Sequence, residues 1–278
     1  MRQLVSLNLK CVPAKKALVS GLSPAAFYGK GVFTTLAVNQ QKPFLWERHW
    51  ARLSENASRL GIDASAFPEQ SAKEALAETI AANKIRAGRA RLTLIDESAN
   101  ALWNFDAGRQ TSLLITAAAR RPLPAASLRL NLSPFPLNSQ SALAGIKSCN
   151  YLENLLAYEN ARREGFDEAL RLTEKGKIAS AAMANVFWIK RGKIFTPSLE
   201  TGCLAGTTRG FLLEAAQARG FEVYQVQAGA GEIRQADEIF LTSSGIGVQS
   251  VGRFEDLTFD DRLTSELRSI FEAAATAI

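Results

Sequence analysis

Lys147 is the residue whose type and surroundings most directly suggest chemistry. It lies within residues 145–151 (Gly-Ile-Lys-Ser-Cys-Asn-Tyr), a few residues before a predicted helix. Burial and the positive end of a helix dipole both disfavour an ammonium, so both lower the pKa of a lysine. A neutral lysine amine can attack an aldehyde and form a Schiff base. The alternative for a single lysine is an ordinary surface position.

Residues 204–209 (Leu-Ala-Gly-Thr-Thr-Arg) run directly into another predicted helix. The glycine permits close approach to the backbone, and Thr207 and Thr208 bring N–H groups and hydroxyls to the helix N-terminus. This arrangement is typical of an anion-binding site. Taken alone, the same residues also fit an ordinary helix N-cap.

Two further features could bind a phosphate. Ser243 and Ser244 follow a predicted strand and precede Gly245, so hydroxyls and backbone could form a phosphate cup; the alternative is a simple turn. Arg52 lies on a predicted helix and could clamp a phosphate with its planar guanidinium, or be solvated.

The composition excludes several other chemistries. His49 is the only histidine, which removes most zinc sites and histidine-dependent triads, and we expect it to pack or cap. We therefore predict no metal site. Cys11, Cys149 and Cys203 are widely spaced and form no CxxC pair. With no signal-like N-terminal stretch, this predicts a reduced, cytoplasmic protein.

The net charge is +6, and the basic residues are scattered without interleaved aromatics. This argues against nucleic acid as a partner and fits a small anionic ligand. No apolar run approaches the roughly 20 residues of a membrane span.

The elements that must position these residues indicate a mixed α/β fold. At about 150 residues per domain, 278 residues make two domains or one large one. We predict an α+β domain at 1–119, a proline-containing linker at 120–126 and an α/β domain at 127–278. Periodicity predicts helices at 47–60, 69–82, 151–164, 208–219 and from 261 onward. Strands are predicted at 31–38, 44–46, 90–95, 112–116, 128–132, 168–172, 185–189, 221–224 and 238–242.

In combination, six segments resemble the class IV pyridoxal-phosphate enzymes, which include branched-chain and D-amino-acid aminotransferases and 4-amino-4-deoxychorismate lyases. The resemblance runs from about Tyr28 to Val251. The segments, in order, are 28–35, 49–53 (the H-x-x-R-L helix), 145–152, 184–188, 204–209 (the L-x-G-x-T-R loop) and 236–242.

The resemblance implies a smaller α+β N-terminal domain, a larger barrel-like α/β C-terminal domain, pyridoxal 5'-phosphate as cofactor and a homodimer. It also implies that Lys147 holds the cofactor aldehyde and then acts as the base at the substrate α-carbon. The phosphate would be bound by Arg52, Thr207, Thr208 and Ser244, together with Ser243.

One position departs from the family pattern. The family places a glutamate five residues before the asparagine that is Asn185 here, and it pairs with the pyridine nitrogen; this chain has Ser180. A serine can hydrogen-bond a neutral nitrogen but cannot hold a pyridinium by charge, so the electron sink should be weaker. Three interpretations follow: a lyase that tolerates a weaker sink, a changed reaction, or a member with reduced or lost catalysis.

The stretches 33–35 (Phe-Thr-Thr) and 148–153 are similar to the lyase versions of their segments. We therefore predict an aminodeoxychorismate lyase, which eliminates pyruvate to give 4-aminobenzoate for folate biosynthesis. The alternative is a branched-chain or D-amino-acid aminotransferase. The family's usual Arg-Gly loop is replaced by residues 96–98 (Asp-Glu-Ser), so the candidate substrate-binding residues are Lys30, Phe33, Arg89 and Arg91.

Overall fold

The computed structural model describes residues 3–98, 110–120 and 127–277. The chain divides into two compact units. The first contains residues up to 121 together with Ile146–Asn150, and the second contains the remaining residues up to Ala277. Residues 146–150, which lie within the predicted C-terminal domain (127–278), thus belong to the first unit. Most of the expected linker, 121–126, lies outside the described residues.

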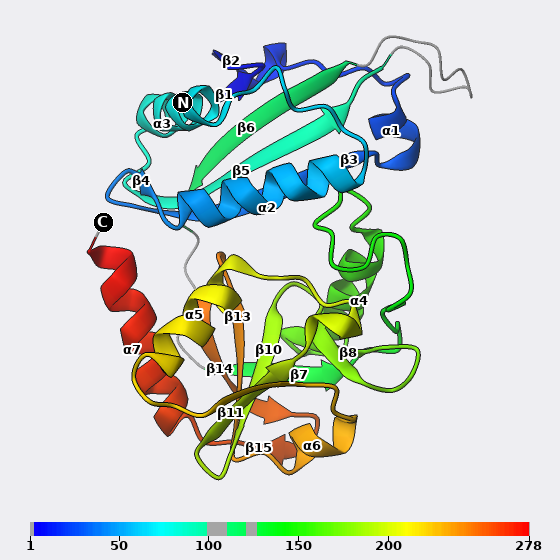
Figure 1. The fold of residues 1–278 in the computed structure, drawn as a ribbon, viewed down its shortest axis with the longest axis vertical. Helices are drawn as coiled ribbons and strands as arrows, with labels where there is room; N and C mark the ends of the chain where they lie inside the picture. The colour runs from blue at the N-terminus through cyan, green and yellow to red at the C-terminus, as the bar shows by residue number, and fades with distance from the viewer. Residues whose placement is uncertain (1–2, 99–109, 121–126, 278) are drawn as a thin grey trace. The chain divides into compact units, whose positions relative to one another are not determined.

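The described part of the first unit contains a six-stranded antiparallel sheet in the order β2-β1-β6-β5-β3-β4 (Figure 1). Its strands are β1 (Leu4–Leu7), β2 (Lys10–Pro13), β3 (Gly31–Asn39), β4 (Lys42–Pro43), β5 (Ala87–Asp96) and β6 (Thr111–Ala119). Its helices are α1 (Pro24–Tyr28), α2 (Trp46–Arg59) and α3 (Glu69–Ala82), with a short 3-10 helix at Ala14–Lys16.

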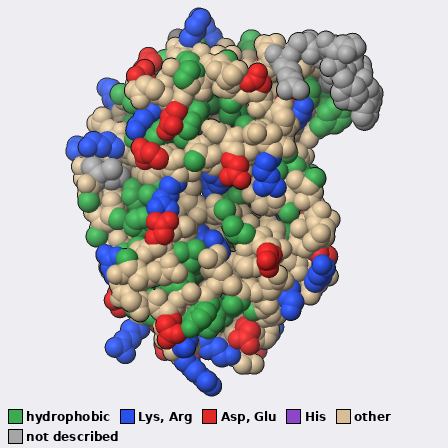
Figure 2. Space-filling model, in the orientation of Figure 1, with side chains coloured by type: hydrophobic (Ala, Val, Ile, Leu, Met, Phe, Trp, Pro, Cys, Tyr) green, Lys and Arg blue, Asp and Glu red, His purple; other side chains and the backbone are tan. Residues whose placement is uncertain are grey.

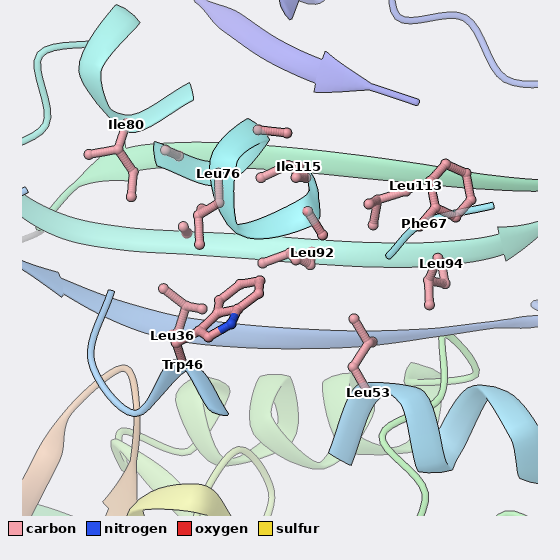
Figure 3. Close-up of a cluster of buried hydrophobic side chains, with 14 of the residues drawn as sticks. Leu36, Trp46, Leu53, Phe67, Leu76, Ile80, Leu92, Leu94, Leu113 and Ile115 are labelled. Carbon is pink, nitrogen blue, oxygen red and sulfur yellow. The ribbon is translucent and has the colours of Figure 1, made fainter. Parts of the chain in front are cut away.

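The core of this unit lies between one face of the sheet and helices α2 and α3 (Figure 3). Alternate strand residues such as Leu36, Leu92 and Ile115 pack with Leu53 of α2 and Leu76 of α3, and all five are buried. The amphipathic period of the helices and the two-residue period of the strands therefore bury the same apolar set.

The same alternation divides strand β3 between two environments. Thr34 shares its parity with Leu36 and lies on the helix-covered face. Phe33 lies on the opposite face, where it pairs in register with Thr93 of β5. Arg91, two residues before Thr93, shares that face.

The described part of the second unit has a nine-stranded mixed sheet in the order β12-β11-β10-β13-β14-β7-β8-β9, with β15 paired to β14. Its strands are β7 (Leu128–Leu132), β8 (Glu168–Leu172), β9 (Ile178–Ala181), β10 (Asn185–Lys190), β11 (Lys193–Pro197), β12 (Val223–Val226), β13 (Glu238–Ser243), β14 (Gly247–Phe254) and β15 (Leu257–Thr258). Its helices are α4 (Leu152–Arg163), α5 (Thr207–Gln217), α6 (Ala230–Arg234) and α7 (Arg262–Thr276), with a 3-10 helix at Leu199–Thr201.

This sheet must curl back on itself. Strands β9 and β10 are separated by only three residues in the chain, 182–184, but by β13, β14, β7 and β8 in the sheet order. The Ala181 N–H also donates to the Ala184 carbonyl, which ties the end of β9 to the start of β10. The result is a curled half-barrel, and the predicted mixed α/β class is confirmed.

The prediction of a strand at 44–46 is wrong. Leu45 has a φ of 56° in the left-handed region, and Trp46 is the first residue of α2. The Trp46 side chain is buried, and its Nε1–H donates to Glu69. A three-residue apolar run does not distinguish a strand from the first turn of a buried helix.

On the face shown in Figure 2, lysine and arginine side chains lie among acidic and polar ones and do not form a stripe. Within the described residues, no helix is both long and apolar enough to cross a membrane. In the same residues, no group of three or more histidine, cysteine or carboxylate side chains could hold a metal ion.

Candidate active site

The backbone of Lys147 is held as part of the first unit. The segment Ile146–Asn150 runs beside the start of β3: the Phe33 N–H donates to the Lys147 carbonyl (2.9 Å), and the Cys149 N–H donates to the Gly31 carbonyl (2.8 Å). The Lys147 N–H donates to Oδ1 of Asn56 on α2 (2.8 Å). A strand-like pairing and a helix side chain together therefore fix the position of this lysine.

The Lys147 amine lies in a cationic, partly buried environment. Its Nζ is 4.5 Å from the centre of the Phe33 ring, and the Arg91 guanidinium lies 3.7 Å from the same ring centre. Burial, followed by the charges of Arg52 and Arg91, lowers the pKa of Lys147 to about 7. Much of this amine is therefore neutral, and hence nucleophilic, near neutral pH. Burial is the largest of these causes, and the two guanidinium charges add to it.

Arg52 is also part of the first unit, on α2. Its Nη2 donates to the Thr34 hydroxyl (2.9 Å), and that hydroxyl lies 2.7 Å from Nδ1 of His49. Both Arg52 and Lys147 act electrostatically on His49. The charges of Arg52 and Arg91 both lower the pKa of Lys147, so these three side chains form a cationic cluster within the first unit.

The other candidate substrate residues differ in their surroundings. Lys30 forms an ion pair with Asp96 at 2.8 Å. Arg91 donates through Nε to Thr93 (3.1 Å) and interacts with the Cys149 thiol. Arg89 is half-buried and shares the sheet face of Arg91. Arg91 lowers the pKa of Lys147 by its charge, and the Phe33 ring lies 4.5 Å from Lys147 Nζ.

In the second unit, two predicted phosphate segments meet. Helix α5 begins at Thr207, directly after Gly206, and both Thr207 and Thr208 are buried. The Thr207 hydroxyl lies 3.4 Å from the hydroxyl of Ser244 in the β13–β14 hairpin. The Ser243 hydroxyl accepts from the Gly245 N–H at 3.2 Å within the same turn. The N-terminus of an eleven-residue helix and a hydroxyl pair are thereby placed side by side, which suits an anion.

Position 206 requires a glycine because the Asn185 side chain lies very close to its Cα. An added Cβ would lie 2.0 Å from Oδ1 of Asn185, whose Nδ2 donates to the Leu204 carbonyl at 2.8 Å. The backbone of Gly206 is extended (φ −66°, ψ 137°), so the limitation is space and not conformation. Asn185 thus positions the loop that leads into α5.

Ser180 lies on β9 opposite Arg171 of β8 in the antiparallel register. Both residues are buried, with Arg171 only 1% exposed. The guanidinium donates to the carbonyls of Phe135 (3.1 Å) and Pro136 (2.9 Å) and to Glu153. Directly opposite side chains lie on the same sheet face about 5 Å apart at Cβ. The serine at the position expected to carry a glutamate is therefore flanked by a buried cation.

Sequence reasoning missed three residues of this arrangement. Asn56 stands one helical turn after Arg52, and this spacing was a signal that both could face Lys147. Asn185 belonged to a recognised segment but had no role assigned to it. Arg171 gave no signal, because an arginine in a strand pattern is usually exposed.

Comparison with known proteins agrees with this arrangement. The family model for amino-transferase class IV matches residues 31–254. The aminodeoxychorismate lyase of Bacillus subtilis (strain 168) is 27% identical over 97% of this chain and 94% of its own length. A putative branched-chain-amino-acid aminotransferase of Methanocaldococcus jannaschii is 28% identical over 95% of this chain and 92% of its own.

The fold is similar to that of a branched-chain amino acid aminotransferase of T.th. solved with pyridoxamine 5'-phosphate, with a TM-score of 0.89 and 25% identity over 100% of this chain and 95% of that one. The relatives thus include both a lyase and aminotransferases. The matched region includes the Lys147 segment, Arg52, Ser180 and the loop before α5. The chain therefore belongs to the class IV aminotransferase family of pyridoxal-phosphate-dependent enzymes.

Proposed function

We propose that this protein is an aminodeoxychorismate lyase, which releases pyruvate from its substrate and leaves 4-aminobenzoate. Lys147 is the catalytic residue. Arg52, Thr207, Thr208 and Ser244 bind the cofactor phosphate, with Ser243 shaping the turn, and Ser180 lies at the pyridine nitrogen. We also propose the homodimer that the family resemblance implies, which sedimentation analysis would test.

The residues of each unit fit the cofactor. In the first unit, the lowered pKa of Lys147 provides an amine that can react with an aldehyde. In the second, the N-cap residue of α5 is Gly206, which has no side chain that could cap the helix, and an added Cβ there would lie 2.0 Å from Asn185 Oδ1. A helix N-terminus preceded by a glycine is suited to a phosphate.

Bound pyridoxal phosphate supplies an aldehyde for covalent attachment of an amine and a ring that accepts electrons from the substrate carbon. Lys147 Nζ, once displaced by the substrate amine, removes the proton from the carbon that bears that amine. Lys147 then delivers the proton to the methylene carbon of the leaving enolpyruvyl group, which departs as pyruvate while the substrate ring becomes aromatic. A pKa of about 7 lets Lys147 both accept and return this proton near neutral pH.

The observation that carries the choice of a lyase is Ser180 opposite Arg171. A hydroxyl beside a buried cation cannot hold a pyridinium by charge, so the cofactor ring should be a weaker electron sink. Aromatisation provides driving force that transamination lacks. The lyase reaction therefore tolerates this substitution better than an aminotransferase would.

The test is to incubate the holoenzyme with aminodeoxychorismate and measure 4-aminobenzoate and pyruvate, which we expect in equal amounts. Some relatives of this chain are named as aminotransferases. An aminotransferase would instead convert its cofactor to the amine form when it is given an amino acid. That conversion without 4-aminobenzoate would overturn the lyase assignment.

Ser180→Glu tests whether the serine, in place of the family's glutamate, has abolished catalysis. Under the lyase proposal, the wild type forms product and the variant shows no gain. An inactive wild type whose activity appears in Ser180→Glu would instead mark a family member with lost catalysis. The absorption spectrum of the bound cofactor checks that both proteins are loaded.

Arg91→Gln is expected to raise the KM for the substrate about tenfold with a smaller effect on kcat, because a guanidinium beside Phe33 and Lys147 can bind a substrate carboxylate. The variant should also raise the pKa of Lys147, since a positive charge is removed. Steady-state kinetics measure the first effect. The exposed Arg86, changed to Gln, is the matched control; an unchanged KM in Arg91→Gln would exclude this role.

The pH dependence of cofactor capture follows from the pKa of Lys147. Only the neutral amine attacks an aldehyde, so the initial rate at which the apoprotein forms its Schiff base should rise with pH and level off above about pH 7. An ordinary lysine would continue to gain neutral amine up to about pH 10. Stopped-flow absorbance, with Lys147→Ala as the blank, distinguishes the two profiles.

A further inference from the structure

Thr34, His49 and Arg52 form a buried hydrogen-bonded chain, which we call the hydroxyl relay. Thr34 lies on β3, and His49 and Arg52 lie one turn apart on α2, so all three are elements of the first unit. Thr34 and His49 are each only 1% exposed. A polar group this deeply buried is costly unless it is hydrogen-bonded, and here both are.

The direction of the hydrogen bond between Arg52 and Thr34 is fixed by the chemistry of the two groups. A guanidinium only donates, so the Thr34 oxygen accepts from Nη2 of Arg52 at 2.9 Å. The single hydroxyl proton of Thr34 is then available to Nδ1 of His49, 2.7 Å away. The Thr34 oxygen has a second lone pair, so the 2.7 Å contact fits a donor on either side; the relay takes the Thr34 hydroxyl as the donor, with Nδ1 unprotonated and the imidazole proton on Nε2.

The electrostatics favour the same state. Burial, then the charge of Arg52 and that of Lys147, lowers the pKa of His49 to about 3. A protonated ring would carry an N–H at Nδ1 and donate to the Thr34 oxygen, so it could no longer accept the Thr34 hydroxyl proton. His49 thus stays neutral across the neutral pH range, as the relay requires.

We propose that Thr34 and His49 are positioning residues that hold the Arg52 guanidinium in the orientation in which it binds the cofactor phosphate. This inference rests on the proposed function, since it assumes the phosphate role of Arg52. Thr34 fixes one N–H of the guanidinium, and His49 fixes the direction of the Thr34 hydroxyl. The only histidine of the chain would then act on the phosphate site through Thr34 and Arg52.

The test compares binding of pyridoxal phosphate with binding of pyridoxal, which has the aldehyde and no phosphate. Thr34→Val removes the hydroxyl and keeps the shape; we expect about tenfold weaker binding of pyridoxal phosphate and unchanged binding of pyridoxal. Thr34→Ser keeps a hydroxyl and should retain most of the affinity. A purely structural role for Thr34 would weaken both ligands equally, and that result would overturn the proposal.

Arg52→Gln separates this inference from the proposed function. It should lower the preference for pyridoxal phosphate over pyridoxal, and adding Thr34→Val to it should cause little further loss, because the relay acts through Arg52. If Arg52→Gln lowers the preference and Thr34→Val does not, the relay is wrong and the phosphate role of Arg52 stands. If Arg52→Gln leaves the preference unchanged, both are overturned.

His49 itself provides a direct readout. As the only histidine, it gives a single set of ring nitrogen signals in ¹⁵N NMR of the histidine-labelled protein. We expect the neutral Nε2–H form from pH 5 to pH 9, and a shifted Nδ1 signal in Thr34→Val. A signal that titrates near pH 6.5, or an Nδ1–H form, would contradict the relay.

Discussion

Lys147→Ala is expected to lower turnover by about a thousandfold or more and to remove the visible absorption of the covalently bound cofactor. The variant loses the amine that reacts with the aldehyde and the base that moves the proton, and a positioned base alone is typically worth about 10²–10⁴-fold in rate. The fold should survive, because the contacts that fix this residue are made by its backbone N–H and carbonyl. Absorption spectra and single-turnover assays measure both effects.

Lys73→Ala is the matched control. Lys73 is an exposed lysine of α3 that pairs with Glu47 at 3.2 Å, and an exposed ion pair contributes little to stability. The control should keep both the absorption band and the rate. A Lys147→Ala protein that retained the band would show that a different amine holds the cofactor.

Gly206→Ala is expected to weaken cofactor binding by at least about tenfold. The new Cβ would lie 2.0 Å from Oδ1 of Asn185, a distance that real atoms do not tolerate, so either the loop before α5 or the Asn185 side chain that holds the Leu204 carbonyl must move. Forcing one carbon into a packed site typically costs about 1–3 kcal/mol. Because Thr207 follows directly, the displacement reaches the helix N-terminus that is proposed to bind the phosphate. Titration of the apoprotein with pyridoxal phosphate measures the loss.

Two variants show whether the clash is the cause. Gly231→Ala adds the same carbon where no atom lies within 4 Å, and it should bind the cofactor normally. Asn185→Ala removes the clashing oxygen, so combining it with Gly206→Ala should cost less than the sum of the two single changes. Strict additivity would mean that these residues do not oppose each other.

Local patterns were sufficient for much of the secondary structure. Helix α3 spans Glu69–Ala82, the range predicted from its period, and α2 and α4 differ from their predictions by one residue at each end. Strands β7 and β8 match their predicted ranges because alternation and flanking turns are local signals. Strand β9 was missed, since its run Ile-Ala-Ser-Ala is small and nearly uniform and shows no alternation.

The arrangement of the candidate site depended on information that is not local. The segments carrying Lys147, Arg52 and the α5 loop were recognised by type and order, but a period cannot show that residues 146–150 pair with β3, more than a hundred positions earlier. The same holds for Arg171. Its burial becomes visible only when the backbone carbonyls of residues 135 and 136 are brought to it.

The pairing of Ile146–Asn150 with β3 also limits how the protein can be divided. A fragment ending near residue 121 would retain its helices and most of its sheet but leave the backbone groups of Gly31 and Phe33 without their strand partner. An open strand edge is a template for association with other chains. We therefore expect that the N-terminal unit cannot be isolated by a single cut, and that a fragment with full solubility would need the 146–150 peptide supplied in trans or fused to it.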